Sequence, residues 1–256
     1  MVFLIVNSII ANAQLEITMS SRNQSGNEYY QTLLSRAFEN AGVPYQIKHL
    51  GQINTQRQIK FFEQGKQSLI FRMRSPLRDQ RYLRVDVPLT NGLIAKRLLL
   101  INENDQKKIS HINNLSDLKD TNLIAVFGEK WVDIDIWRYN KLAYIELTGD
   151  INKVYAMLKH GNRGFDYFSR GILEIVRDHQ LHPYLSIEQK LLFDFNNDIY
   201  IYVRKNQKQL HQQLTLILKK AQDDGLIDEV IYEMYGDLSS QFNTEHRKTI
   251  KLQSPY

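Results

Sequence analysis

Residues able to do chemistry gather between positions 161 and 171, in the stretch "GNRGFDYFSRG". The stretch holds one carboxylate, Asp166, and two guanidiniums, Arg163 and Arg170, among three aromatic side chains. A carboxylate favours a cationic ligand group, whereas a guanidinium favours a carboxylate or phosphate through its paired N–H donors. The stretch therefore predicts either the end of an ordinary strand or part of a site for a charged ligand.

A second concentration of charge lies upstream, in "FRMRSPLRDQRYLR", which carries five arginines between positions 72 and 84. A run of this kind is most often a solvated surface. The net charge of +5 and the isoelectric point near 9.2 permit an anionic partner but do not require one.

Signatures of catalysis are missing from the sequence. Without cysteine there is no disulfide, thiolate zinc site or cysteine nucleophile, and the seven histidines show no H-E-x-x-H spacing. Neither a G-x-S-x-G elbow nor a phosphate-binding glycine loop occurs, and no spacing forces two carboxylates into a pair. We therefore expect no metal, no cofactor and no enzymatic activity.

Export is indicated by residues 1–13, "MVFLIVNSIIANA", which are uncharged, apolar and end in an A-x-A cleavage pattern. This apolar segment is too short to span a bilayer, so it predicts a signal peptide and a periplasmic mature chain that begins at Gln14. The absence of a basic n-region suggests a start codon placed too late. The alternative is a buried first strand.

Two runs of alternating strands and helices position these residues. The first, over residues 15–73, and the second, over residues 97–168, both follow a β-α-β-α-β order. This order is typical of parallel sheets with right-handed crossovers. A helix follows at 171–179, a strand at 198–206 and helices at 207–225 and 227–236. From about Leu238 the periodicity is lost, and we expect a frayed tail.

The order of elements resembles the periplasmic solute-binding proteins of the polar-amino-acid type (family 3), with a type II two-lobe α/β fold. The resemblance runs from Leu15 to about Tyr235 and is closest to the divergent "transporter substrate-binding domain" branch. It depends on ordered landmarks in the sequence: "YYQTLLSRAFENAG", "VDVPLTNGL", "INNLSDLKDTNLIAVFGEKW", "VYAMLKHGNRGFDYFSRG" and "DIYIYVRKNQKQL".

The resemblance implies two discontinuous lobes, each a mostly parallel sheet flanked by helices. The first lobe would comprise residues 14–94 plus 200–256, and the second residues 97–195. Crossovers near 93–97 and 195–200 would form a hinge, and closure about it would bury a ligand. A small-molecule ligand, a monomeric state, and an ABC-type membrane permease or a membrane sensor as partner are implied as well, without nucleic acid.

The family also implies which residues bind. An arginine a few residues after a Thr/Ser-Pro step grips a ligand carboxylate, and here Ser75-Pro76 precedes Arg78. The segment from Ser75 to Pro88 is about one residue longer than the family pattern, so Arg81 is a rival. Each could equally be a surface charge.

A glycine turn supplies further contacts in the second lobe, here "FGEKWVD" with Gly128, Lys130 and Trp131. The small hydroxyl residue usual beside this glycine is missing. Trp131 would wall the pocket or pack against a helix.

The main departure from the family is at Arg170. Binders of amino acids hold the ammonium with an aspartate about four residues after the "FD" aspartate, and that count leads from Asp166 to Arg170. A guanidinium there would repel an ammonium, so an anionic ligand is favoured. Asp166 would then bind ligand or be structural, capping N–H groups or pairing with Arg163. The candidate ligand-binding residues are Arg78, Arg81, Gly128, Lys130, Trp131, Asp166 and Arg170.

These inferences predict an exported solute-binding protein that captures a small polar ligand, with an anion favoured, for a membrane transporter. One alternative is a sensory or regulatory ligand-binding module of the same fold. Another is an enzyme on this fold. A third, an effector domain of a transcription regulator, would need an attached DNA-binding helix pair.

Overall fold

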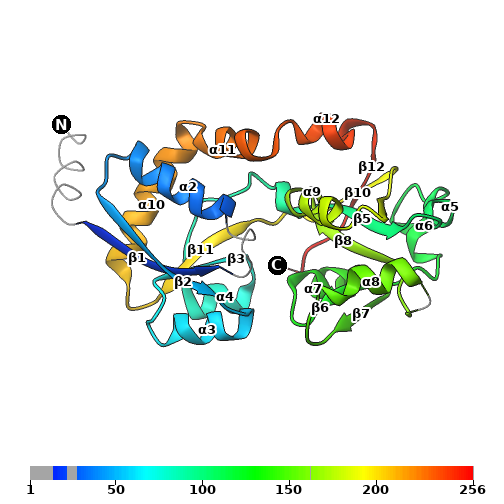
Figure 1. Cartoon of the computed structure of the whole chain (residues 1–256), viewed down its shortest axis with the longest axis horizontal. Coiled ribbons are helices and arrows are strands. Elements are labelled where there is room, and N and C mark those ends of the chain that lie inside the picture. Colours follow the sequence, from blue (N-terminus) through cyan, green and yellow to red (C-terminus); the bar gives the residue numbers. More distant parts are fainter. Residues whose placement is uncertain (1–13, 22–27, 162, 256) are drawn as a thin grey trace. The chain divides into compact units, whose positions relative to one another are not determined.

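The chain divides into two compact units in a computed structural model that describes residues 14–21, 28–161 and 163–255. Unit 1 comprises residues 1–91 and 199–236, and unit 2 comprises residues 92–198 and 237–256 (Figure 1). The predicted signal peptide lies outside the described residues. Among the described residues, no helix has the length and apolar character needed to cross a membrane.

Unit 1 contains two sheets. In the first, β1 and β2 pair in parallel, and in the second, β11 lies between β3 and β4 and is antiparallel to both. The backbone N–H of Ser68 donates to the carbonyl of Thr18 (2.8 Å), which ties β1 to the start of β3. The elements are β1 (Leu15–Ser21), α2 (Glu28–Asn40), β2 (Tyr45–Gln52), α3 (Thr55–Glu63), β3 (Leu69–Met73), α4 (Pro76–Arg81), β4 (Tyr82–Val85), β11 (Ile199–Arg204), α10 (Lys208–Asp223) and α11 (Leu226–Tyr235).

The predicted β-α-β-α-β order of unit 1 is therefore present. Its third strand, however, does not join the first two in one parallel sheet, as the order predicts. β3 pairs with the return strand β11 along five residues, from Met73 opposite Ile199 to Leu69 opposite Val203. The sequence pattern shows which segments are strands. It does not show which strand, among those far apart in the chain, will pair with a given one.

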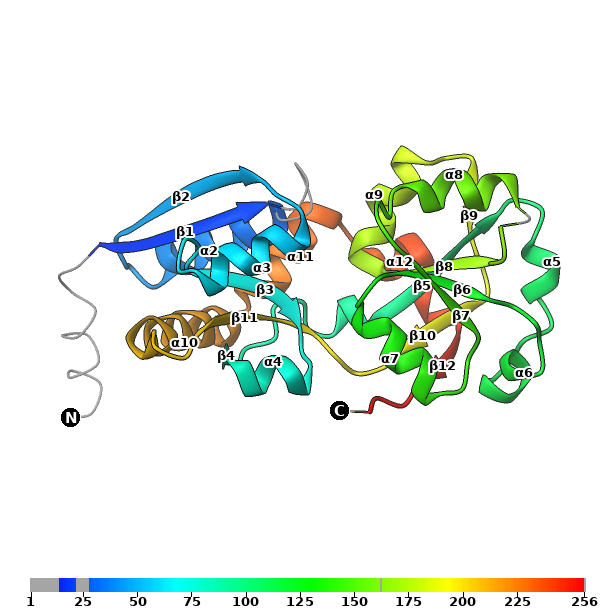
Figure 2. The same cartoon turned by 90° about the horizontal axis from the view of Figure 1, so that it is seen from below.

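Unit 2 is built on one seven-stranded sheet in the order β12-β10-β5-β8-β6-β7, with β9 also on β5. β6 is parallel to β7 and β8, whereas β5 is antiparallel to β8. Figure 2 shows α8 and α9 on one side of this sheet and α7 on the other. The elements are η1 (Leu93–Ala95), β5 (Lys96–Asn102), α5 (Gln106–Ile109), α6 (Leu115–Lys119), β6 (Ala125–Gly128), α7 (Val132–Tyr139), β7 (Tyr144–Leu147), α8 (Lys153–His160), β8 (Tyr167–Gly171), α9 (Ile172–Leu181), β9 (Leu185–Ile187), β10 (Leu191–Asp194), α12 (Leu238–Phe242), η2 (Thr244–His246) and β12 (Lys248–Lys251).

The prediction of a frayed tail is wrong. Residues beyond Leu238 form α12 and then β12, which pairs in parallel with β10 and buries Ile250. A four-residue strand with one buried side chain gives too short an alternation to be seen in the sequence. The tail also belongs to unit 2, not to the first lobe as predicted, so the chain passes between the units at 91/92, 198/199 and 236/237.

Candidate functional site

In unit 2, three of the predicted site residues meet at one edge of the sheet. Because β6 and β8 are parallel, Gly128 at the end of β6 and Arg170 near the end of β8 lie at the same edge. β5 runs the other way and brings Arg97 there, opposite Gly171 in the β5–β8 register. The carboxyl edge of parallel strands is where open α/β sheets bind ligands.

The indole of Trp131 covers the end of β6. A Cβ on Gly128 would lie 2.5 Å from the indole Nε1, closer than real contacts allow, so a larger residue there would displace the ring. The Trp131 ring is 6.0 Å from that of Phe168, and its side chain is half-buried. Both predicted roles of Trp131, packing and walling a site, are compatible with this position.

Arg170 lies over these rings, with its guanidinium carbon 5.5 Å from the Trp131 ring centre and 4.9 Å from that of Phe168. Its Nε is 2.5 Å from the carboxylate of Asp178, and its Nη1 is 3.4 Å from that of Glu174. Burial by itself lowers the pKa of Arg170, but the two carboxylates outweigh burial and raise that pKa above its usual value. The guanidinium is therefore a charged group whose charge is matched within unit 2.

An arginine that the sequence analysis did not single out extends this arrangement. Arg97, only 3% exposed, pairs through Nη2 with Asp133 (2.7 Å) and through Nη1 with Glu174 (3.0 Å). Glu174 thus lies between Arg97 and Arg170, and it also accepts from the Gly171 backbone N–H (3.0 Å). We call Arg97, Asp133, Arg170, Glu174 and Asp178 the ion-pair cluster.

The ion-pair cluster contains two cations and three carboxylates, so it carries one net negative charge when all five groups are ionised. Burial raises the pKa of Asp133 against the opposing effect of Arg97. Glu174 is the most exposed of the three carboxylates, at 37% of its side chain. The edge therefore does not present a simple excess of positive charge.

Asp166 is not at this edge. It precedes β8, and its carboxylate accepts from the backbone N–H of Ile124 (2.8 Å), while its own N–H donates to the Ile124 carbonyl. Four residues of extended strand separate it from Arg170 by roughly 13 Å. This position agrees with the structural alternative, the capping of an N–H group, and not with a joint site for Asp166 and Arg170.

Lys130 is the remaining predicted residue of the glycine turn. It adopts a left-handed backbone conformation, with φ of 63°, and its ammonium pairs with the adjacent Glu129 (2.9 Å). Its side chain is 78% exposed. Lys130 is therefore a surface residue that is paired locally.

In unit 1, Arg78 lies just beyond the end of β3. Ser75 caps α4, Pro76 follows at the first helical position, and Arg78 occupies the first turn, a favoured start for a helix. The Nη1 of Arg78 donates to the carbonyl of Met73 (2.7 Å) and lies 3.3 Å from Ser75 Oγ. Two neutral acceptors thus orient this guanidinium.

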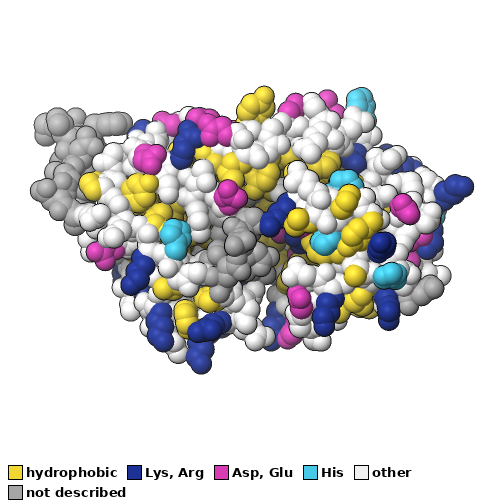
Figure 3. Space-filling view, in the orientation of Figure 1, with side chains coloured by type: hydrophobic (Ala, Val, Ile, Leu, Met, Phe, Trp, Pro, Cys, Tyr) yellow, Lys and Arg dark blue, Asp and Glu magenta, His cyan; other side chains and the backbone are white. Residues whose placement is uncertain are grey.

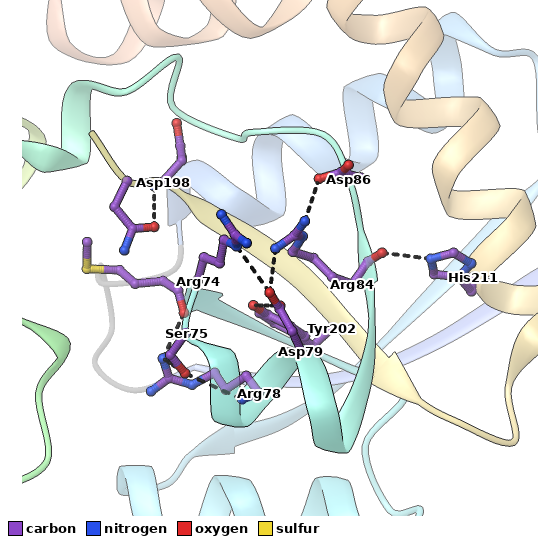
Figure 4. Close-up of polar contacts among 11 residues, drawn as sticks. Arg74, Ser75, Arg78, Asp79, Arg84, Asp86, Asp198, Tyr202 and His211 are labelled. Atoms are coloured by element: carbon purple, nitrogen blue, oxygen red, sulfur yellow. Dashed lines mark hydrogen bonds and ion pairs between the residues drawn. The ribbon is translucent and has the colours of Figure 1, made fainter. Parts of the chain in front are cut away.

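Asp79 holds α4 against its neighbours (Figure 4). Its carboxylate accepts from Arg74 (3.1 Å), from Arg84 (2.8 Å) and from the hydroxyl of Tyr202 on β11 (2.9 Å). Arg84 also pairs with Asp86 (3.0 Å). The arginine run thus serves largely to connect α4, β4 and β11, and it is not simply the solvated surface expected from its composition.

The rival arginine, Arg81, points to a different partner. Its Nη2 pairs with Glu63 of α3 (2.8 Å), and the same carboxylate accepts from the hydroxyl of Tyr82 (2.7 Å). Burial, with the help of Glu63, raises the pKa of Tyr82 to about 12.

Within the described ranges, no cluster of three His, Asp or Glu side chains could hold a metal ion.

Solved structures share this fold, although no family model and no curated protein matches the sequence. An amino acid ABC transporter substrate-binding protein, AbpA from Streptococcus pneumoniae, bound to L-arginine, is 14% identical over 94% of this chain and all of its own, with a TM-score of 0.60. The probable amino-acid ABC transporter extracellular-binding protein YtmK from Bacillus subtilis is 15% identical over 88% of this chain and 99% of its own (TM-score 0.65). The ancestral amino-acid-binding protein AncCDT-1, described as a precursor of cyclohexadienyl dehydratase, is 13% identical over 91% and 99% (TM-score 0.62). The chain therefore has the type II two-lobe fold of these substrate-binding proteins.

Proposed function

We propose that this chain is an exported solute-binding protein that captures a small polar ligand with residues of both units and presents it to an ABC-type permease. The observation that carries the proposal is the edge of unit 2, where the half-buried indole of Trp131 and the guanidinium of Arg170 meet at the carboxyl ends of parallel strands. The fold shared with transporter binding proteins supports it.

In this proposal Arg78 binds a carboxylate of the ligand. Its position just after β3, beside the cap of α4, resembles the place where the family has its carboxylate-binding arginine, whereas Arg81 points to Glu63 of α3. A guanidinium can offer a carboxylate two parallel N–H donors. Hinge closure between the units, near 91/92 and 198/199, would complete the capture.

The ion-pair cluster is our ground for proposing the charge of the ligand. The expectation of an anion rested on an uncompensated Arg170, but Asp178 and Glu174 balance that guanidinium. We therefore propose a carboxylate-bearing polar ligand whose other end is neutral or cationic, such as an amino acid, and keep the dianion as the competing case.

Two other functions share this fold. A sensory module would bind the same class of ligand and differ only in its membrane partner. An enzyme would convert the ligand, and the dehydratase lineage of AncCDT-1 gives that alternative its specific support. Incubation of each binding ligand with the purified protein, followed by product analysis, separates capture from turnover.

A thermal-shift screen of the chain from Gln14 tests the proposal. The panel should contain arginine, glutamine, glutamate, dicarboxylates, sugars and inorganic phosphate. A ligand present at a hundredfold its Kd adds about 2.7 kcal/mol to the free energy of unfolding, which is readily measured. We expect an amino acid to raise the melting temperature most. If only sugars, or no compound at all, raise it, the proposed function is wrong.

A further inference from the structure

A basic pocket lies on the surface of unit 1, along α3 and the turn that follows it. It has a volume of about 530 Å³. Its lining consists of three cations, three amides and one aromatic ring, without a carboxylate: Asn54, Gln56, Arg57, Lys60, Phe61, Gln64 and Lys66. We call it the α3 pocket.

The spacing of residues along α3 explains why the cations share one face. Arg57, Lys60, Phe61 and Gln64 follow at i, i+3, i+4 and i+7, which places them on one side of the helix. The other side buries Phe62 in the core of unit 1.

The turn after α3 returns Lys66 to the same face. Gly65 has a φ of 79°, and the N–H of Lys66 donates to the carbonyl of Phe61 (2.9 Å), as in a Schellman C-cap. The Lys66 ammonium then lies 5.2 Å from the centre of the Phe61 ring, and the Arg57 guanidinium carbon lies 5.1 Å from it. Phe61 therefore fixes the spacing of two of the three cations.

In the described part of the chain, the cations of the α3 pocket have no carboxylate partner. Elsewhere in unit 1, Arg74 and Arg84 pair with Asp79, and Arg81 pairs with Glu63. By contrast, within the described part of the chain no carboxylate lies within 4.0 Å of the charged nitrogens of Arg57, Lys60 or Lys66, all of which are exposed. Figure 3 shows Lys and Arg side chains gathered over α3, at the lower left, with hydrophobic atoms between them.

Unit 1 as a whole is also more basic than unit 2. Unit 1 contains sixteen Lys and Arg against eleven Asp and Glu, whereas unit 2 contains seventeen of each. The whole net charge of +5 therefore belongs to unit 1. An anionic partner approaching this protein is attracted to unit 1, and the α3 pocket is a concave place there with unneutralised cations.

We propose that the α3 pocket is a second binding site, distinct from the sheet edge of unit 2, for a phosphate-bearing anion. A guanidinium matches phosphate oxygens with paired N–H donors, and two ammonium groups add point charges. The amides of Asn54, Gln56 and Gln64 supply further donors at the rim. Free organic phosphates and phospholipid headgroups share this chemistry. The proposal is independent of the ligand proposed for the sheet edge.

The test compares two triple variants that remove the same charge. The first, Arg57→Gln with Lys60→Gln and Lys66→Gln, removes the cations of the α3 pocket. The control, Lys119→Gln with Lys141→Gln and Lys153→Gln, removes three exposed lysines of unit 2. The probes are pyrophosphate, in calorimetry, and phosphatidylcholine vesicles with or without phosphatidylglycerol, in cosedimentation at low salt.

We expect wild type and control to bind at least one phosphate-bearing probe equally, and the α3 variant to bind it about 100-fold more weakly, since each cation near an anionic surface contributes several-fold. Binding of vesicles with phosphatidylglycerol alone identifies a headgroup site, and binding of pyrophosphate alone identifies a site for a free compound.

Three outcomes overturn the proposal: equal weakening in both triple variants, no binding of any phosphate-bearing probe by wild type, or binding of an oligoglutamate peptide but of neither phosphate probe. Because all three substituted side chains are exposed, unchanged melting temperatures should show that the α3 variant is folded.

Discussion

Each unit places an arginine just beyond or near the carboxyl end of a strand, but the two arginines have different surroundings. In unit 1, Arg78 follows β3, and its Nη1 is oriented by a backbone carbonyl and a hydroxyl. In unit 2, Arg170 lies near the end of β8, over two aromatic rings, and is paired with Asp178 and Glu174. The same residue type at similar places in two α/β units thus serves two purposes.

This difference shows that the presence of an arginine at a strand end does not predict the charge of the ligand. The guanidinium of Arg170 is paired with two carboxylates of unit 2, whereas the Nη1 of Arg78 contacts a carbonyl and a hydroxyl. We therefore expect substitution of Arg170 to lower the free energy of unfolding most, and substitution of Arg78 to lower the affinity for ligand most.

The largest expected effect is on stability, from Arg170→Gln. Removal of this guanidinium leaves Asp178 and Glu174 without one of their cations in a largely buried place, and breaking such a pair costs about 3 kcal/mol. Urea unfolding of the ligand-free protein measures the loss. Arg78→Gln should cost less than about 1 kcal/mol under the same conditions.

A double variant refines this prediction. Arg170→Gln combined with Asp178→Asn removes the uncompensated carboxylate together with the cation, so part of the lost stability should return. Equal losses of stability for Arg78→Gln and Arg170→Gln would erase the distinction between the two arginines.

The next effect is on affinity, from Arg78→Gln. Loss of charge-assisted hydrogen bonds to a ligand carboxylate should weaken binding by about 100-fold. Arg81→Gln is the matched control on the same helix, and we expect it to change the Kd less than about threefold, because Arg81 faces Glu63. Calorimetry with the ligand found by the screen measures both. A larger effect of Arg81→Gln than of Arg78→Gln would mean that Arg81, and not Arg78, binds the ligand carboxylate.

A smaller effect is expected from Asp79→Asn, which changes the support of Arg78 and not Arg78 itself. Arg74 and Arg84 would lose a carboxylate, while Tyr202 could still donate to the amide oxygen. We expect a loss of about 1 kcal/mol in the free energy of unfolding and a loss of affinity smaller than that of Arg78→Gln. Affinity lost to the same extent as in Arg78→Gln would mean that the network, and not the guanidinium, determines binding.

The smallest effect concerns pH and belongs to unit 2. His182 stacks on Tyr155, with ring centres 3.8 Å apart, and burial lowers the pKa of His182 against the opposing effect of Asp178. The unfolded chain therefore binds this proton more readily than the folded chain. Stability should fall as the pH drops below about 6.5 and level off below the folded-state pKa.

His182→Gln should flatten this part of the profile of unfolding free energy against pH, whereas His49→Gln, at an exposed position of unit 1, should not. An identical slope in wild type and His182→Gln would show that this histidine has no part in the pH dependence.

The sequence predicts the strands and helices of the two β-α-β-α-β runs, because their apolar periodicity is strong. It does not predict the short elements α4, β4, β9, β10, α12 and β12. The family resemblance implies that Gly128, Trp131 and Arg170 belong to one site, and in the structure the parallel strands β6 and β8 bring them to one sheet edge. The partners of Arg170 were not predicted. Asp178 lies two turns into α9, and nothing in the local pattern distinguishes it from a surface carboxylate.

The other features that the sequence does not predict also depend on contacts between residues far apart in the chain. The role of Asp166 depends on a contact with Ile124, which is 42 residues away in the chain. The α3 pocket depends on the contrast between cations that are paired and cations that are not, and a sequence shows only that both are basic. Contacts between distant residues, not local patterns, determine which charges remain available.

We propose that Arg78 of unit 1 and the sheet edge of unit 2 each contact the ligand, and hydrogen exchange with and without the ligand from the screen tests this most directly. We expect slower exchange at residues 73–81 of unit 1 and at residues 128–132 and 170–174 of unit 2, with little change at the α3 pocket. Slower exchange confined to one unit would contradict capture of the ligand by both.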